Sequence, residues 1–241
     1  MRGSLYLALP LGAALFAVLL AYAGAAQVAA AVAAAGWGLA WVSLFHLPVL
    51  GLDALGWWWL GATRRLPFAW VALARWISES VNDLLPVAQI GGNVVRARLA
   101  AGRRLSGPEA GAAVVVDLTL IALAQFLYTL LGLGLLLGRL GRAQTAEVAA
   151  SVAAGGLAVA AFYAAQRRGL FVLLARLVER AAAGRAWFGL VGGAVALDAR
   201  VVALYRERRR LLTSGAAHLG AWLLGTGEVW LALRFLGHPL G

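Results

Sequence analysis

The stretch WISESVNDLLPVAQIGGNVVRARL, which runs from Trp76 to Leu99, decides the fold of this chain. It places several polar side chains in otherwise apolar sequence and interrupts that sequence at Pro86 and again at Gly91-Gly92. Proline removes a backbone donor and clashes with the preceding helical turn, and paired glycines allow a hinge. The pattern therefore predicts two short helices that meet at a non-helical elbow.

The polar content of this stretch predicts where it lies. Broken apolar sequence is tolerated in a membrane only where protein buries it or where it lines a wet cavity. An acidic group at mid-membrane costs roughly 2.5–3.5 kcal/mol, which disfavours lipid exposure. We therefore predict a re-entrant segment over about 67–105 that faces a polar cavity. Its candidate substrate-binding residues are Glu79, Asn82, Asp83, Pro86, Gln89, Gly91, Gly92, Asn93 and Arg96.

Two of these candidates carry like charges on one face. Glu79 and Asp83 are four residues apart, so they are neighbours on a helix and repel each other unless a basic group neutralises them. We expect Arg96 or Arg98 from the second helix to do so. Arg96 also follows the Gly-Gly hinge at the start of a helix, where amide donors and a guanidinium can converge on a phosphate.

Composition places the whole chain in a membrane. It is 63% hydrophobic, with a mean hydropathy of +0.84, and 13% charged, whereas soluble domains carry about 25% charged residues. A spanning helix needs roughly 20 apolar residues. The sequence thus predicts an all-α polytopic membrane protein with one membrane domain over 1–241. The expected spans lie at about 5–26, 37–60, 111–137, 148–165 and 211–236.

The charge pattern predicts the orientation. All 21 basic residues are arginine, and 18 of them are Arg2 or lie in the segments 61–110 and 166–210. The positive-inside rule then places the N-terminus and both segments on the cytoplasmic side of a bacterial inner membrane. The net charge of +11 is explained by this topology, with anionic lipid headgroups rather than nucleic acid as partners. Segment 166–210 alternates apolar and basic patches and predicts amphipathic helix on the inner leaflet.

Local signals predict some boundaries. Ser106 and Glu109 fit a capping box, which starts the third span. Three tryptophans from Trp57, followed by two arginines, mark a membrane–water boundary. The alanine-rich run 25–35 is expected to be the turn between the first two spans. The first apolar run also fits a cleavable signal, but an uncleaved span agrees better with the arginine asymmetry.

Ionisable groups inside spans are rare and suggest function. Asp117 in the third span is either a further candidate substrate-binding residue or structurally paired with an arginine. His46 and Asp53 are seven residues apart and share a face, which leaves open a proton relay or simple solvation near the interface. Glu228 and His218 in the fifth span are open between a functional role and a packing role.

Recognisable catalytic motifs are missing from the sequence. Cysteine is absent, which excludes disulfides and thiolate chemistry. The sequence contains no Walker lysine, no H-E-x-x-H, no G-x-S-x-G and no dinucleotide fingerprint. We therefore expect no catalytic residue, no cofactor and no metal.

The run SESVNDLLPVAQIGGNVVRARL and the later run SGPEAGAAVVVDLTL resemble the membrane domain of lysylphosphatidylglycerol synthases. The likeness is greatest to a stand-alone branch, the hopanoid biosynthesis-associated membrane proteins. Members are longer, so the resemblance implies that this chain is a C-terminally incomplete fragment. The matching residues are Glu79, Asn82, Leu85-Pro86, Gly91-Gly92, Arg96 and Asp117.

This resemblance implies a flippase-like protein that binds an aminoacylated phospholipid or a hopanoid-type lipid and translocates it between leaflets. The aminoacyl-transfer activity of the family belongs to a separate soluble domain, which nothing in this sequence resembles. Two alternatives remain open. In the first alternative, the chain is a membrane-embedded lipid-modifying enzyme that uses Glu79, Asp83 or Asp117. In the second, it is a non-catalytic accessory protein of a lipid-biosynthesis complex.

Overall fold

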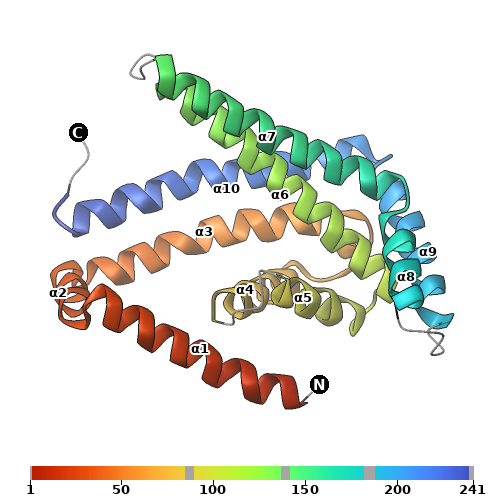
Figure 1. Ribbon diagram of the computed structural model, residues 1–241, viewed down its shortest axis with the longest axis horizontal. Coiled ribbons are helices and arrows are strands. Elements are labelled where there is room, and N and C mark those ends of the chain that lie inside the picture. Colours follow the sequence, from red (N-terminus) through yellow and green to blue (C-terminus); the bar gives the residue numbers. More distant parts are fainter. Residues whose placement is uncertain (1, 85–89, 137–141, 182–187, 239–241) are drawn as a thin grey trace.

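The computed structural model describes residues 2–84, 90–136, 142–181 and 188–238, and these residues are helical with no strand (Figure 1). The all-α prediction is confirmed. The elements are α1 (Arg2–Ala23), α2 (Ala25–Ala35), α3 (Gly38–Trp58), the 3₁₀ helix η1 (Gly61–Arg65), α4 (Phe68–Leu84), α5 (Gly91–Ala101), α6 (Gly107–Leu136), α7 (Arg142–Arg167), α8 (Leu170–Ala181), α9 (Phe188–Leu204) and α10 (Arg208–Phe235).

Three helices in the described part of the chain are long and apolar enough to cross a membrane. They are α3, α6 and the Thr145–Arg167 part of α7. The predicted first span differs, because its helix α1 is bent by 87° from α2. The predicted fifth span is α10, which has 28 residues and a length of about 42 Å. It is long enough to cross a membrane, but it is less apolar than these three helices and is not counted with them. The five predicted spans thus become three such helices, or four if the bent pair is counted.

The alanine-rich run 25–35 forms helix α2, so the prediction of a turn there was wrong. Alanine has the highest helix propensity of all residues, and the run contains no glycine or proline that would break a helix. The chain instead turns at the two glycines that bracket the run. Gly24 and Gly36 have φ of 84° and 48°, a backbone region that glycine occupies without a Cβ clash.

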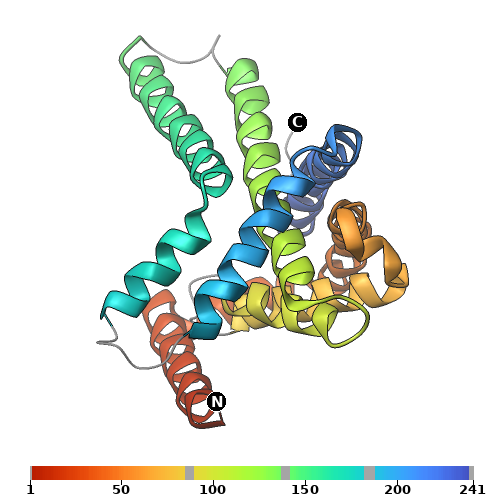
Figure 2. The same cartoon turned by 90° about the vertical axis from the view of Figure 1, so that its right-hand side faces the viewer.

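Helices α3 and α10 lie side by side and α6 crosses them (Figure 1). Glycines allow the close approach of the first two. A Cβ on Gly56 of α3 would lie 2.6 Å from the His218 ring, and one on Gly227 of α10 would lie 2.9 Å from the Phe45 ring. Figure 2 shows α6 between the α3–α10 pair on one side and α7 on the other. The three helices α3, α6 and α10 therefore form the centre of the molecule.

Helices α4 and α5 pack against each other and contact α3 and α6, respectively. A Cβ on Gly92 would lie 1.9 Å from the Ser78 backbone oxygen, so glycine is required where α5 packs back along α4. Helix α5 has 11 residues and a length of about 16 Å, well short of a bilayer core of roughly 30 Å. These are the two short helices that the sequence predicts. The elbow residues Pro86 and Gln89 lie outside the described residues.

The predicted capping box is present at the start of α6. The Ser106 backbone N–H donates to Glu109 Oε2 over 2.9 Å, and the Glu109 N–H donates to Ser106 Oγ over 3.4 Å. Trp57, the first of the three tryptophans in the predicted boundary, has a side chain that is fully buried in the core. The Arg96 guanidinium lies 4.6 Å from the centre of the Trp57 ring, which fixes this indole inside the protein.

The predicted amphipathic segment contains α8 and α9. Helix α8 exposes several large apolar side chains, including Leu173 and Leu177. Asp198 of α9 accepts hydrogen bonds from the backbone N–H groups of Phe171 and Val172 in the first turn of α8, over 3.3 and 2.9 Å. A carboxylate there satisfies amides that a helix leaves unpaired, so Asp198 sets the angle between the two helices.

Candidate functional site

Five helices each contribute one ionisable side chain to a cluster at the centre of the molecule. Its members are Asp53 from α3, Arg75 from α4, Arg96 from α5, Asp117 from α6 and His218 from α10. We call this cluster the central ion network. It joins helices α4 and α5 to all three central helices.

Asp117 holds the deepest position in the central ion network. Arg96 Nη1 donates to Asp117 Oδ2 over 2.6 Å, and Arg75 Nη1 lies 3.7 Å from the same oxygen. His218 Nε2 lies 2.9 Å from the other oxygen, Asp117 Oδ1. The side chains of Asp117, Arg96 and His218 are all 0% exposed. Both oxygens of a buried carboxylate are therefore satisfied, as burial of a charge requires.

His218 bridges the two acidic residues of the network. Its Nδ1 lies 2.7 Å from Asp53 Oδ1, and Arg75 Nη2 donates to Asp53 Oδ2 over 3.1 Å. Both ring nitrogens face carboxylate oxygens, an arrangement in which an imidazolium donates to both. Two carboxylates thus face two guanidiniums and one histidine. Removal of Arg96 or Asp117 leaves a fully buried charge without its nearest ionic partner.

The α4–α5 hairpin holds Arg96 in position. Asn93 Oδ1 accepts a hydrogen bond from Arg96 Nη2 over 3.0 Å. One turn earlier, Asn82 Oδ1 of α4 accepts from the Gly92 backbone N–H over 2.8 Å and ties the start of α5 to α4. Three predicted site residues therefore help to position a fourth, Arg96. They are Asn82, Gly92 and Asn93.

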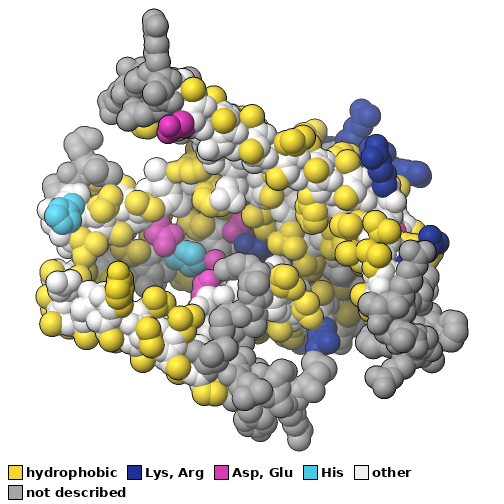
Figure 3. Space-filling model, in the orientation of Figure 1, with side chains coloured by type: hydrophobic (Ala, Val, Ile, Leu, Met, Phe, Trp, Pro, Cys, Tyr) yellow, Lys and Arg dark blue, Asp and Glu magenta, His cyan; other side chains and the backbone are white. Residues whose placement is uncertain are grey.

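A second cluster of ionisable side chains lies beside the central ion network. His46 Nδ1 of α3 lies 3.1 Å from Glu228 Oε2 of α10, and His46 Nε2 lies 3.9 Å from Glu79 Oε1 of α4. These three side chains are 39%, 28% and 32% exposed, respectively. We call them the acidic mouth. Figure 3 shows acidic and histidine side chains gathered in a hollow at the centre of one face, surrounded by hydrophobic side chains.

A cavity of about 420 Å³ connects the two groups. Asp53 and Arg75 of the central ion network and Glu79 of the acidic mouth all line it. Tyr128 of α6 and Trp222 of α10 line another part, with their rings stacked 5.4 Å apart. The Tyr128 hydroxyl is 2.9 Å from Thr226 Oγ1. The cavity therefore offers carboxylates, a guanidinium and aromatic faces within a largely apolar helix bundle.

The structure places the sequence candidates in different roles. Glu79 lines the cavity, whereas Arg96 and Asp117 are buried in the central ion network beside it. Asp83 is exposed near the end of α4, and Gly91 opens α5. Pro86 and Gln89 fall outside the described residues. The hairpin arginine Arg96 is paired with Asp117, and Glu79 instead approaches His46.

The sequence did not predict which ionisable side chains meet across the spans. His46 and Glu228 are 182 residues apart, and Asp53 and His218 are 165 apart. The sequence singles out these residues because ionisable side chains are rare in apolar spans. It does not indicate which of them lie in contact with each other. In the described part of the chain, no group of three or more His, Asp or Glu is arranged to hold a metal ion.

The helices and the buried polar centre define the class: a polytopic membrane protein with ionisable groups inside its helix bundle. The family model described as the lysylphosphatidylglycerol synthase TM region matches residues 7–241. The chain belongs to this family, which indicates a function related to membrane lipid. Neither the curated proteins nor the solved structures contain a significant match.

Proposed function

We propose that this chain is a flippase-like protein that binds a lipid headgroup and translocates the lipid between leaflets. The headgroup binds in the cavity between the central ion network and the acidic mouth, which we call the central cavity. One observation carries the proposal: a cavity of about 420 Å³ is lined by Asp53 and Arg75 of the central ion network and by Glu79 of the acidic mouth. Charged groups inside a membrane protein characteristically face the bundle interior and mark substrate pathways. The polar centre provides such a pathway for a headgroup. The apolar interior of the bilayer would otherwise exclude the headgroup.

The side chains around the cavity favour a headgroup that carries an ammonium group. Glu79 and Asp53 supply carboxylates to its lining, and Tyr128 and Trp222 supply aromatic rings. An ammonium group is attracted to both carboxylates and aromatic faces, most strongly where water is excluded. An aminoacylated phospholipid has this chemistry, and a hopanoid-type lipid fits the same site where it carries an amine.

A separate apolar cavity supports binding of the lipid tail. It has a volume of about 590 Å³ and lies between α6, α7 and α10, with Leu123, Leu127 and Leu219 among its lining residues. One end carries a buried polar group in which Gln166 Nε2 donates to Thr119 Oγ1 over 2.8 Å. Tails occupy apolar space, so the central helices offer room for both parts of a lipid.

The proposal includes the membrane in which the chain lies and its orientation there. We place the chain in the bacterial inner membrane with a cytoplasmic N-terminus, because the arginine distribution favours that side. Membrane lipids with anionic headgroups are its proposed neighbours, and lipid-biosynthesis proteins, including those of the hopanoid branch, are its proposed partners.

A leaflet-resolved assay tests the proposal. The purified chain is placed in liposomes containing a labelled aminoacylated phosphatidylglycerol, and movement between leaflets is followed with no other factor present. Glu79→Gln should slow movement about tenfold, since it removes one charge-assisted contact. Glu147→Gln, an exposed change on α7, is the matched control. Equal rates with and without protein would contradict the proposal, and a chemically altered lipid would indicate a lipid-modifying enzyme instead.

A further inference from the structure

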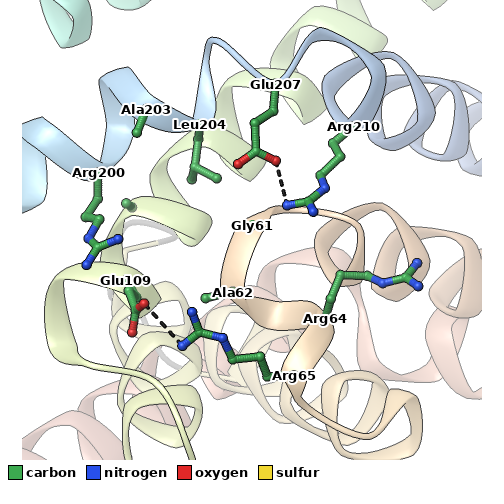
Figure 4. Close-up of a pocket in the computed structure, with 11 residues that line it drawn as sticks. Gly61, Ala62, Arg64, Arg65, Glu109, Arg200, Ala203, Leu204, Glu207 and Arg210 are labelled. Carbon is green, nitrogen blue, oxygen red and sulfur yellow. Dashed lines mark ion pairs between the residues drawn. The ribbon is translucent and has the colours of Figure 1, made fainter.

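A second pocket lies between η1, the start of α6, the end of α9 and the start of α10 (Figure 4). Its volume is about 390 Å³, and it shares no lining residue with the central cavity. Six charged side chains line it. They are Arg64, Arg65, Arg200, Arg210, Glu109 and Glu207.

The charges in this basic pocket do not balance. Arg65 Nη1 lies 3.3 Å from Glu109 Oε1, and Arg210 pairs with Glu207 over 2.5 Å. The four arginines therefore exceed the two glutamates by two positive charges. Arg200 is exposed and forms no ion pair within the described residues. Figure 4 shows Arg65 and Arg200 on opposite sides of Glu109, both directed towards the open space.

Two helices begin beside this pocket. Helix α6 begins at Gly107 and α10 begins at Arg208, so the first turns of both lie at the pocket. Amides in a first helical turn favour anions. Guanidinium groups match the oxygens of a phosphate as planar, two-pronged donors. The two features together favour an anionic ligand over a neutral one.

We propose that this basic pocket binds a phosphate group, carried either by an anionic lipid headgroup or by a soluble ligand. The excess of two charges suits a phosphomonoester, which carries about −1.5 to −2 at neutral pH. A bound phosphate contacts η1, which follows α3, together with α9 and α10. The site is independent of the proposed translocation, because none of its residues lies in the central cavity.

Calorimetric titration of the full chain in detergent tests this site with two probes, dihexanoyl phosphatidate and inorganic phosphate. Arg200→Gln and Arg65→Gln should each weaken phosphatidate binding about tenfold, the loss of one charge-assisted hydrogen bond. Glu109→Gln should tighten binding, because it removes a negative charge and releases Arg65. Glutamine still completes the capping box with Ser106, so this variant keeps the helix start.

The control is Arg168→Gln, which removes the same charge from an exposed arginine outside the pocket. It should bind phosphatidate like the original chain. If both probes show the same ranking of variants, any phosphate group is the ligand; if only phosphatidate does, the ligand is a lipid headgroup. Equal weakening by Arg168→Gln and Arg200→Gln, or no tightening by Glu109→Gln, would overturn the site in favour of diffuse charge attraction.

Discussion

Asp117 of α6 and Arg96 of α5 form an ion pair that is fully buried, with 2.6 Å between Arg96 Nη1 and Asp117 Oδ2. This pair attaches the α4–α5 hairpin to a helix long and apolar enough to span a membrane. A buried pair is specific because either partner alone is a buried unpaired charge. The hairpin is therefore positioned by charge at the centre of the bundle.

Arg96→Ala should damage the protein far more than Arg64→Ala. Loss of one partner from a buried pair costs about 3–5 kcal/mol, whereas Arg64 borders the basic pocket and lies over the half-buried rings of Trp58 and Trp59, 4.2 and 4.1 Å from their centres. The unfolding temperature in detergent measures the difference, and lipid movement at matched expression measures its consequence. Equal effects of the two substitutions would remove the special position of Arg96.

His218→Gln should be tolerated better than His218→Asn. The glutamine amide can reach the position of Nε2, which contacts the fully buried Asp117, whereas asparagine replaces Nδ1, which contacts Asp53. Asp53 is 20% exposed, so water can satisfy its oxygen, but an abandoned acceptor on Asp117 costs about 1–3 kcal/mol. Thermal unfolding of both variants tests this order. Greater stability of the asparagine variant would assign the stronger contact to Asp53.

Much of the architecture could be predicted from the sequence, because it depends on local patterns. Apolar length predicts α3, α6 and α7, and the Ser106 and Glu109 spacing predicts the start of α6. The two glycines before Asn93 predict a break, and the structure starts α5 there. Such signals act within a few residues along the chain, so no knowledge of tertiary packing is needed to read them.

The pairings within the site could not be predicted in the same way. The sequence marks His46, Asp53 and His218 as unusual, but helix rotation and the α3–α10 contact decide what each one meets. Arg96 illustrates the limit, since its position after the glycine hinge is compatible with phosphate binding and equally with the buried ion pair that the structure contains. Helical spacing fixes which residues share a face, and packing alone fixes what that face touches.

Gly92→Ala should destabilise the protein, although alanine is the better helix former by about 1 kcal/mol. The new Cβ would lie 1.9 Å from the Ser78 backbone oxygen, and a backbone atom cannot rotate away. Separation of α4 from α5 should then cost about 1–3 kcal/mol or more. Gly132→Ala in α6 is the matched control, because nothing lies within 4 Å of its Cβ position. Unfolding temperatures that fall equally, or not at all, would contradict the tight contact.

Reporter fusions test the proposed orientation. A fusion at Ala62, in η1, and one at Gly184 should report the cytoplasm, and one at Thr145 should report the opposite side. The basis is the arginine distribution, with 18 of 21 in the N-terminal residues and the two long segments. An outside signal at Ala62 would reverse the whole assignment.

Cysteine accessibility tests whether the central cavity is wet. The chain has no cysteine, so each introduced thiol is read alone. In proteoliposomes, Thr226→Cys, which lines the cavity, should react with a small water-soluble thiol reagent. Leu223→Cys on the same helix should not, because Leu223 is 51% exposed on the apolar surface and does not line the cavity. Single cysteines from Ser80 to Asn93 should react mainly on the face of Glu79 and Asp83.

Lipid substrate should protect Thr226→Cys, since a headgroup in the cavity covers the thiol. Protection by an aminoacylated lipid and none by a lipid without an amine would support the role of the carboxylates in the acidic mouth. Reaction at Thr226→Cys and Leu223→Cys at the same rate would mean that water reaches this helix from all sides. In that case the cavity would not be the headgroup site on which the proposed translocation depends.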